Sequence, residues 1–411
     1  MVAVFWCWLG LMAVIVATWA GRHYQLSRAR RDLPPLTADM YAGPMDDLPS
    51  VSVLVAAKDE ETNIDDCVRS LLSQQYPHFE VIAINDRSSD RTAEIIDRWA
   101  GADPRFVALH VRELRPGWFG KNNAMREGIQ RARHDWFCFT DADCVFTSPR
   151  ALAVAMRYAL AERADFLSIL PAHQSRSFWE RVIQPACSGI MMLWFHPLRV
   201  NDPGRATAYA NGAFMLMRRS CYEAIGGHEA VKTDVNEDLQ MAIRAKRAGL
   251  RLRVTSNEDL YTVRMYSTLR QIWAGWTRIF YGCFRTPRRL VASILAVAVF
   301  SLLPWATALA GLLILGGDAP GRGLWAWLTG AAAVAGLMQI SVMCRFYALT
   351  RSSPLYGILY PLGAAISLGT LINALWRAGG RGAITWRGTT YQGAEVIHAA
   401  AAPPGGAPQK T

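Results

Sequence analysis

Apolar and polar positions divide the chain into three stretches with different patterns. Residues 2–20 carry no charge and are enough to cross a bilayer as a helix, and four arginines follow within residues 22–31. Because the positive charge follows the apolar run, the pattern predicts an uncleaved anchor whose N-terminus lies outside and whose continuation is cytoplasmic. The polar, proline-containing residues that follow, up to position 49, are predicted to be a linker.

The middle stretch alternates short apolar runs with segments of helical periodicity. Residues 51–57 and 79–85 are apolar runs of strand length, and between them residues 62–75 repeat apolar side chains at helical spacing. Two further strands are expected at 106–111 and 136–140, on either side of a helical run at 122–133. This alternation predicts parallel strands joined by crossover helices, which is an α/β layer fold.

Three long apolar runs follow, at 290–315, 324–343 and 355–376, and each is a candidate membrane span. Pro304 and Pro361 are tolerated there if neighbouring helices satisfy the freed backbone groups. Three full spans would leave the arginines at 377, 381 and 387 outside, so either one segment is interfacial or re-entrant, or the positive-inside rule fails here. The predicted parts are an anchor (1–21), a linker (22–49), an α/β domain (50–260), an interfacial amphipathic segment (261–289), membrane helices (290–376) and a tail (377–411).

Composition and charge narrow the class of protein. A chain that is 52% hydrophobic and 19% charged is neither disordered nor a coiled coil. Residues 1–259 hold 31 basic and 31 acidic side chains, so the net charge of +11 lies wholly in residues 260–411, beside the apolar runs. That placement is typical of membrane topology and headgroup contact, and we expect no nucleic-acid partner. The eight cysteines are single, without zinc-ligand spacing, and are predicted to be buried in a reducing compartment.

Four acidic clusters are candidates for chemistry. Three follow predicted strands, and the fourth opens a predicted helix at 239–248; they are Asp59 with Glu60, Asp86, Asp141 with Asp143, and Glu237 with Asp238. Ligands of open α/β sheets bind outside the carboxyl ends of the strands, so we expect the first three clusters to converge on one edge. The side chains at i and i+2 of an extended segment point the same way, and Mg²⁺ uses one or two carboxylates plus substrate phosphates. The alternative is that these carboxylates are solvated in turns.

In this order, the clusters resemble the donor-site motifs of the family-2 glycosyltransferases of GT-A fold. Further matches are GWFGKNNA at 117–124, NGAFML at 211–216 and GGH at 226–228. The chain looks most like the membrane-anchored members, which include ceramide glucosyltransferase-like and carotenoid- and hopene-associated enzymes, and WRG with a tyrosine at 386–391 fits that subgroup. The resemblance implies a Rossmann-like GT-A domain with one N-terminal and about three C-terminal transmembrane or interfacial helices.

The resemblance also implies roles for individual residues. Asp59, Glu60 and Asp86 would contact the nucleoside, Lys121 would approach the diphosphate, and Asp141 would lie beside the ribose or the metal. Asp143 would bind a divalent metal, Mg²⁺ or Mn²⁺. Asp238 would be the general base that removes the acceptor hydroxyl proton, with Glu237 beside it. The alternatives are a surface lysine at 121 and, at 237–238, carboxylates that only complement the helix dipole.

One stretch departs from the family pattern. Many membrane-embedded relatives carry Q/R-x-x-R-W after the base. Aligning Trp276 with that tryptophan puts Ile272 where the pattern has Gln or Arg and Gly275 where it has Arg. Arg278 or Arg270 would then supply the positive charge for the departing diphosphate, and the alternative is an amphipathic interfacial helix anchored by Trp and Arg. The full pattern is prominent in processive synthases, so the departure of this sequence from it argues against processivity.

The resemblance implies an inverting, non-processive transferase, and the apolar and charge patterns predict that it lies at the cell (inner) membrane, with several membrane spans and a cytoplasmic catalytic domain. The expected partners are a nucleotide-sugar donor, a UDP-sugar by resemblance, and a lipid acceptor. Two alternatives remain open at this stage, a processive polysaccharide synthase and an inactive membrane scaffold of the same fold. His173, His196 and His228 lack paired ligand spacing and are predicted to be structural. Residues 178–200 are predicted either to wall an acceptor groove or to be a packed core helix.

Overall fold

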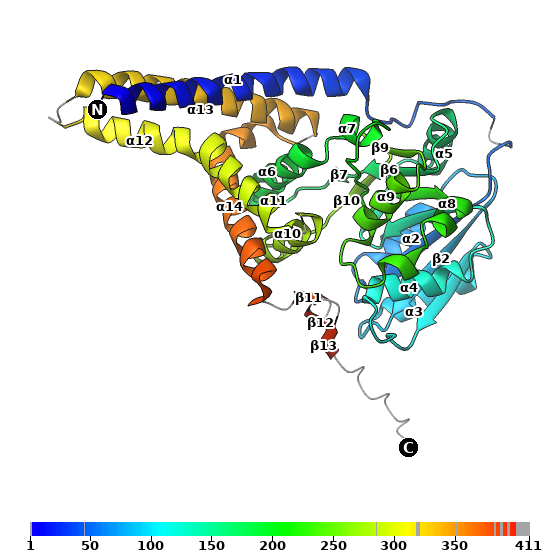
Figure 1. Cartoon of the computed structure of the whole chain (residues 1–411). Helices are drawn as coiled ribbons and strands as arrows, with labels where there is room; N and C mark the ends of the chain where they lie inside the picture. Colours follow the sequence, from blue (N-terminus) through cyan, green and yellow to red (C-terminus); the bar gives the residue numbers. More distant parts are fainter. Residues whose placement is uncertain are drawn as a thin grey trace. The chain divides into compact units, whose positions relative to one another are not determined.

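The computed structural model describes residues 2–44, 46–284, 286–317, 321–350 and 352–381, and the backbone of three short strands between 384 and 399. The chain forms two compact units, which we call the helical unit and the sheet unit (Figure 1). The helical unit consists of Met1–Pro34, Ser175–Trp194 and Tyr266–Arg381, and the sheet unit of Pro35–Gln174, Phe195–Met265 and Gly382–Thr411. The chain therefore leaves the sheet unit for one short excursion, between 175 and 194, before it returns to complete the sheet.

A seven-stranded sheet forms the centre of the sheet unit, in the order β3-β2-β1-β4-β8-β6-β9. Its strands are β1 (Val51–Ala57), β2 (Phe79–Asp86), β3 (Phe106–Val111), β4 (Trp136–Asp141), β6 (Phe166–Leu170), β8 (Met215–Arg218) and β9 (Leu252–Ser256). The first four are parallel to one another, as the alternating pattern predicts, and β8 runs antiparallel to both of its neighbours. The four strands predicted from the sequence are confirmed to within one residue.

Helices cover both faces of this sheet, because alternate residues of each strand point to opposite sides. Val53 and Val55 of β1 pack into one apolar cluster with α2, α3 and α5, whereas Leu54 packs into a second cluster with α4 and α9. The helices of the unit are α2 (Ile64–Leu72), α3 (Thr92–Ala102), α4 (Gly120–Ile129), α5 (Ala151–Ala161), α7 (Pro197–Asn201), α8 (Arg219–Ala224), η1 (His228–Val231) and α9 (Glu237–Arg247). Burial on both faces explains why the parallel strands are nearly continuous apolar runs.

The register of the strands places the acidic clusters at one edge of the sheet. Ala57 at the end of β1 pairs with Asn85 near the end of β2, and Ala56 pairs with Asp141 at the end of β4. The loops that follow these three strands therefore start at the same level. A smaller sheet of β5 (Cys144–Phe146), β10 (Tyr261–Val263) and β7 (Ala172–His173) follows directly after Asp143.

Among its described residues, the helical unit holds four helical segments long and apolar enough to cross a membrane, by length and composition. They are Val2–Asp32, Pro287–Leu315, Arg322–Leu349 and Pro354–Gly379. Its elements are α1 (Val2–Asp32), α6 (Phe178–Trp194), α10 (Leu269–Phe284), α11 (Pro287–Ala296), η2 (Val297–Leu302), α12 (Leu303–Leu315), α13 (Arg322–Leu349), η3 (Pro354–Leu359), α14 (Tyr360–Trp376) and η4 (Arg377–Arg381). One N-terminal and three C-terminal candidate spans are thus present, as predicted.

Helix α1 continues beyond the apolar run that predicts it. The polar residues up to Asp32 are helical and include an Arg28–Asp32 ion pair one turn apart, and the helix ends before Pro34 and Pro35. Proline disfavours the helical conformation of the residue before it, which explains the end point. The rest of the predicted linker is partly ordered, since Leu36 forms a bridge with Asn257.

The two prolines of the C-terminal runs are accommodated in different ways. Pro361 lies in the first turn of α14, where its missing N–H costs no helical bond. Pro304 lies after the π-helical turn η2 and cannot bond to the carbonyl of Phe300. That carbonyl instead accepts hydrogen bonds from Trp19 Nε1 of α1 at 2.8 Å and from Gln339 Nε2 of α13 at 2.9 Å. Neighbouring helices therefore satisfy the freed group, as the sequence requires.

Parts of the predicted C-terminal features lie outside the described residues. Arg285, Arg351, Arg387 and Gly388 and the end of the tail, 400–411, are among them. Of the WRG…Tyr motif, only the backbone of Trp386 and Tyr391 is described. These two lie in β11 (Ile384–Trp386) and β12 (Thr389–Gln392), which pair in an antiparallel sheet with β13 (Glu395–Ala399).

Candidate active site

The loops after β1 and β2 are cross-linked by hydrogen bonds. Asp59 Oδ1 accepts hydrogen bonds from Ser89 N at 2.8 Å and from Ser89 Oγ at 3.0 Å. Its own N–H donates to Ser88 Oγ at 3.0 Å, and the N–H of Glu60 donates to Thr92 Oγ1 at 2.8 Å. Asp59 adopts the left-handed backbone region with φ 53°, a conformation that non-glycine residues hold mainly where the surrounding structure enforces it. The Ser-Ser-Asp-x-Thr turn thus supports the Asp59–Glu60 loop.

Asp86, at the end of β2, is buried and held by its neighbour. Arg87 Nε lies 2.8 Å from Asp86 Oδ1 and Arg87 Nη2 lies 3.0 Å from Oδ2, so both oxygens accept from one guanidinium. Arg87 also adopts the left-handed region, with φ 55°, which turns its side chain back onto Asp86. Sequence reasoning placed Asp86 at a nucleoside and did not foresee this ion pair.

Asp141 and Asp143 follow β4, and Asp143 lies in a region of concentrated negative charge. Burial raises the pKa of Asp143 well above its usual range, and the nearby carboxylates Asp141 and Glu60 raise it further. Within the described residues, no group of three or more His, Cys, Asp or Glu side chains is arranged as a metal site. The two aspartates nevertheless fit a divalent cation that takes its remaining ligands from substrate phosphates and water, because Mg²⁺ commonly binds through only one or two carboxylates.

Lys121 connects this cluster to the fourth acidic pair. It lies in the first turn of α4, and its Nζ is 2.7 Å from Asp141 Oδ1 and 2.7 Å from Glu237 Oε1. Burial alone would lower the pKa of Lys121, but the two carboxylates outweigh it and raise the pKa well above its usual range. Lys121 is therefore a permanent positive charge between the end of β4 and the start of α9.

Asp238, at the second position of α9, is fixed by backbone donors. Its Oδ2 accepts from Gly212 N at 2.9 Å and its Oδ1 accepts from Leu239 N at 2.7 Å. Burial and the neighbouring Glu237 carboxylate raise the pKa of Asp238 above its usual range. A proton acceptor poised near neutral pH is what general-base chemistry needs.

Gly212 lets the backbone approach this cluster. A Cβ atom there would stand 3.1 Å from Lys121 Nζ and 3.6 Å from Asp238 Oδ2. The segment is anchored to the sheet, because Thr140 Oγ1 donates to the carbonyl of Ala213 at 2.8 Å. Sequence reasoning gave Gly212 no role; its position in the NGAFML match was the only signal available.

The structure thus brings Lys121, Asp141, Glu237 and Asp238 into direct contact through side chains or Gly212. Asp143 and Glu60 adjoin this cluster electrostatically, and Asp59 lies in the same loop as Glu60. Asp238, Asp141 and Lys121 were all predicted from sequence motifs, but their mutual contacts were not.

The two remaining predicted residues, Trp276 and Arg278, lie on α10 in the helical unit. Trp276 is buried, and within the described part of the chain its Nε1 has no hydrogen-bond partner. Arg278 Nη2 donates to Tyr266 Oη at 3.4 Å, and Gly275 packs against the same tyrosine ring. The buried positions of α10 recur at three- and four-residue intervals, which is the pattern of an amphipathic helix.

The predicted structural histidines have structural surroundings. His228 is buried, its Nδ1 lies 2.9 Å from Tyr222 Oη, and burial together with Lys121 lowers its pKa to about 3. Burial lowers the pKa of His173 to about 4. His196 Nδ1 accepts from Leu198 N at the start of α7. All eight cysteines are thiols rather than disulfides, and all but Cys7 and Cys344 are buried.

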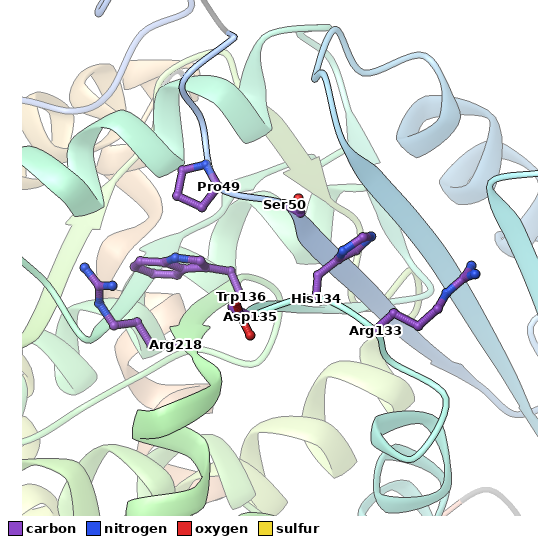
Figure 2. Close-up of a pocket in the computed structure, with 7 residues that line it drawn as sticks. All are labelled: Pro49, Ser50, Arg133, His134, Asp135, Trp136 and Arg218. Atoms are coloured by element: carbon purple, nitrogen blue, oxygen red, sulfur yellow. The ribbon is translucent and has the colours of Figure 1, made fainter.

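A separate pocket of about 360 Å³ lies at the opposite, amino-terminal edge of the sheet (Figure 2). Its lining residues are Pro49, Ser50, Arg133, His134, Asp135, Trp136 and Arg218. The Arg218 guanidinium lies 4.6 Å from the centre of the Trp136 ring, and Arg133 forms an ion pair with the buried Glu80 at 2.9 Å. None of the predicted site residues lines this pocket.

Comparison with known proteins identifies the fold that carries the acidic edge. Residues 52–226 match the sequence model described as glycosyl transferase family 2. Over these residues the chain is similar to a family-2 glycosyltransferase domain. The match ends before Glu237 and Asp238, which therefore lie beyond it.

The chain is also similar to curated proteins in sequence and to a solved structure in fold. The chain is 28% identical over 250 residues to the 4,4'-diaponeurosporenoate glycosyltransferase of Staphylococcus aureus strain MRSA252, covering 60% of this chain and 64% of that protein. It is 27% identical over 233 residues to the protein of the same name from strain USA300, covering 56% and 60%. The chain thus aligns with less than two thirds of these relatives. A mannosyltransferase from Pyrobaculum calidifontis, solved with GDP-Man and Mn²⁺, shares the fold with a TM-score of 0.51 at 18% identity, covering 90% of this chain and 99% of that one.

Proposed function

We propose that the protein is an inverting, non-processive glycosyltransferase that moves a sugar from a nucleotide-diphosphate donor, a UDP-sugar, to a hydroxyl group of a membrane lipid. The observation that carries the proposal is the Lys121 bridge. Lys121 joins Asp141, at the proposed donor edge of the sheet, to Glu237. Glu237 is the neighbour of Asp238, the carboxylate proposed as the base. This bridge supports one shared cluster for donor and acceptor chemistry rather than two distant sites.

In the proposed reaction, Asp59, Glu60 and Asp86 hold the nucleoside, and Asp141 lies near the ribose. A divalent cation, held by Asp143 when bound, supplies positive charge to the leaving diphosphate. Lys121 adds a fixed positive charge beside the same group. Asp238 removes the proton of the acceptor hydroxyl as its oxygen attacks the anomeric carbon, while the bond from that carbon to the diphosphate breaks. A single in-line displacement of this kind inverts the anomeric configuration.

The acceptor is proposed to be a lipid because of the helical unit. Four candidate spans provide a membrane location, and the curated relatives are named for 4,4'-diaponeurosporenoate. The arginines that follow the apolar part of α1 favour a cytoplasmic sheet unit at the cell membrane. Trp276 and Arg278 of α10 are proposed to act on the acceptor or leaving-group side.

Full-length protein in lipid nanodiscs tests the proposal. It is incubated with Mn²⁺ or Mg²⁺, a lipid extract and radiolabelled sugars as UDP- or GDP-donors. We expect label to enter the organic phase as a lipid carrying one sugar, with UDP-sugars as donors and with inverted anomeric configuration by NMR. A polymer product would instead indicate a processive synthase. Neither product nor thermal stabilisation by any donor with metal would indicate a scaffold.

Two substitutions test the site. Asp143→Asn and Asp238→Asn each remove one carboxylate with little change of shape, and we expect turnover to fall by roughly 10²–10⁴-fold for the base. Asp66→Asn, on the exposed side of α2, is the matched control and should keep wild-type turnover. Wild-type turnover in Asp238→Asn would disprove its role as the base.

A further inference from the structure

The first turn of α4 contacts the segment before α9 as well as the donor edge of the site. Next to Lys121, the side chain of Asn122 is fully buried. Its Nδ2 lies 2.8 Å from the carbonyl oxygen of Val231, 3.0 Å from that of Asp234 and 3.3 Å from that of Lys232. The two N–H groups of this amide thus lie within hydrogen-bonding distance of three backbone carbonyls, one at the end of η1 and two in the loop that follows it.

This loop leads directly into α9. Backbone carbonyl oxygens away from water need hydrogen-bond donors, and here Asn122 adds its amide to the Asp234 N–H, which donates to Val231 O at 2.9 Å. The same loop is also tied to α4 through the backbone, because Phe119 N donates to Lys232 O at 2.7 Å. Asp238 follows Asp234 by four residues, so these contacts help to fix the position of the start of α9.

Three separate contacts therefore fix the proposed base from outside its own helix. Gly212 N–H holds the Asp238 carboxylate itself, Lys121 holds its neighbour Glu237, and Asn122 holds the preceding loop. Lys121 and Gly212 lie within the cluster and contact its acidic side chains directly. Asn122 is buried behind it, and the contacts of its amide run to the loop.

We propose that Asn122 is a positioning residue of the transferase: it fixes the loop before α9 and thereby sets where Asp238 meets the acceptor hydroxyl. The proposal rests on the proposed function of Asp238 as the base. Misplacement of a reacting group by about 1 Å is enough to lower a rate by about 10²-fold. Replacing Asn122 should therefore lower kcat strongly and leave the KM for the donor unchanged, because its amide donates to backbone carbonyls that precede α9.

The chain offers a matched control on the same helix. Asn123 is equally buried, but its Nδ2 donates at 3.1 Å to the carbonyl of Glu113, in a loop that does not lead to α9. Asn122→Ala and Asn123→Ala each remove one buried amide from α4. We expect both variants to lose thermal stability and only Asn122→Ala to lose kcat, by about 10-fold to 100-fold per folded molecule. Asn122→Ser, which keeps one hydroxyl donor at a smaller size, should show an intermediate loss and provides a second variant if Ala does not fold.

A double-mutant cycle separates positioning from general damage. If Asn122 acts through Asp238, Asn122→Ala has no further effect on the residual rate of Asp238→Asn. An equal fold loss in both backgrounds, or wild-type kcat in folded Asn122→Ala, overturns the inference. Wild-type turnover in Asp238→Asn instead overturns the proposed base.

Hydrogen exchange gives a readout that does not need activity. Asn122→Ala should accelerate backbone exchange in residues 231–239, whereas Asn123→Ala should accelerate exchange around Glu113. Unchanged exchange at 231–239 in Asn122→Ala would show that the loop does not depend on this side chain, and the inference would be wrong.

Discussion

Asp143 and Asp238 are aspartates whose folded environment disfavours their charge. Burial is the largest cause for both, and it is followed by Asp141 for Asp143 and by Glu237 for Asp238. An unfolded aspartate has a pKa of about 3.9, so between that pH and the raised values the folded chain binds more protons than the unfolded chain. Stability therefore falls as pH rises through this range, which is opposite to the usual effect of an ion-paired carboxylate.

Removing one of these charges should stabilise the fold. We expect Asp143→Asn to raise Tm by a few degrees at neutral and higher pH. Below about pH 4 we expect little effect, because the wild-type Asp143 carboxyl is then largely protonated in both the folded and the unfolded state. Thermal unfolding of the detergent-solubilised protein against pH measures this. In the presence of Mn²⁺ and a nucleotide donor the order should reverse, because the ligands stabilise the wild type more. A lower Tm for Asp143→Asn at neutral pH without ligands would contradict the electrostatic argument.

The raised pKa of Asp238 also predicts how the rate depends on pH. A base acts only when deprotonated, so kcat/KM should rise with pH along a limb that lies well above the pKa of about 3.9 expected for an exposed aspartate. Initial rates from acidic to alkaline pH at fixed metal concentration measure the limb. A rate that has already reached its plateau at about pH 5 would argue against Asp238 as the base.

Residue-level predictability differs among the site residues. The carboxylates could be named from the sequence because strand ends and helix starts can be read from local patterns. The partners of Lys121 could not, since its contacts depend on how α4 packs relative to β4 and α9. The Asp86–Arg87 pair also escaped sequence reasoning, because it depends on the left-handed backbone of Arg87.

At the scale of elements, the hydrogen bonds around Pro304 are among the contacts that join α1 to the helical unit. We expect Trp19→Phe to destabilise this unit, because the carbonyl of Phe300 loses one of its two donors. In Pro304→Ala the restored N–H can bond that carbonyl, so the cost of Trp19→Phe should shrink by about 0.5–1.5 kcal/mol. Tm values of the four proteins in one detergent complete the cycle.

Trp8 provides the control for this cycle. Its Nε1 donates to Thr307 Oγ1 at 3.2 Å and not to a carbonyl freed by proline. The cost of Trp8→Phe should therefore be the same with Pro304 or Ala at position 304. Coupling of equal size for both tryptophans would mean that the proline substitution repacks the helices generally.

Helices and strands were predictable where burial is uniform along them. The strands buried on both faces and the long apolar helices can be recognised from their apolar composition. The extension of α1 to Asp32 was missed because its last turns are polar and are ended only by the prolines that follow. The η2 turn was missed because an apolar run looks the same whether its helix is α or π.

At the scale of the whole molecule, two compact units imply two sets of cores. Val53 is fully buried in the sheet unit, and Leu371 is fully buried in α14 of the helical unit. Multi-unit chains commonly unfold in more than one step, so we expect Val53→Ala and Leu371→Ala to lower different transitions. Truncating a buried Leu costs about 2–5 kcal/mol, which is large enough to resolve. Calorimetry combined with hydrogen exchange of each unit measures this, and a single transition lowered equally by both would contradict it.

The excursion of residues 175–194 could not be predicted from local pattern. Residues 178–194 are apolar enough for a core helix of an α/β domain, and nothing in their sequence states which unit buries them. The structure packs α6 against α14, where Cys187 Sγ lies 3.1 Å from Ser367 Oγ, and it also bonds α6 to α13, where Tyr347 Oη donates to Val182 O at 3.3 Å. Only the tertiary partners of α6 reveal its unit.

This threading has a consequence for biogenesis. The partners of α6 are synthesised late, since Cys187 and Ser367 are 180 positions apart. Strands β8 and β9 and the helix that carries Asp238 emerge from the ribosome in between. The apolar helix α6 must therefore be kept from water, at the lipid surface or on a chaperone, while the sheet unit is completed.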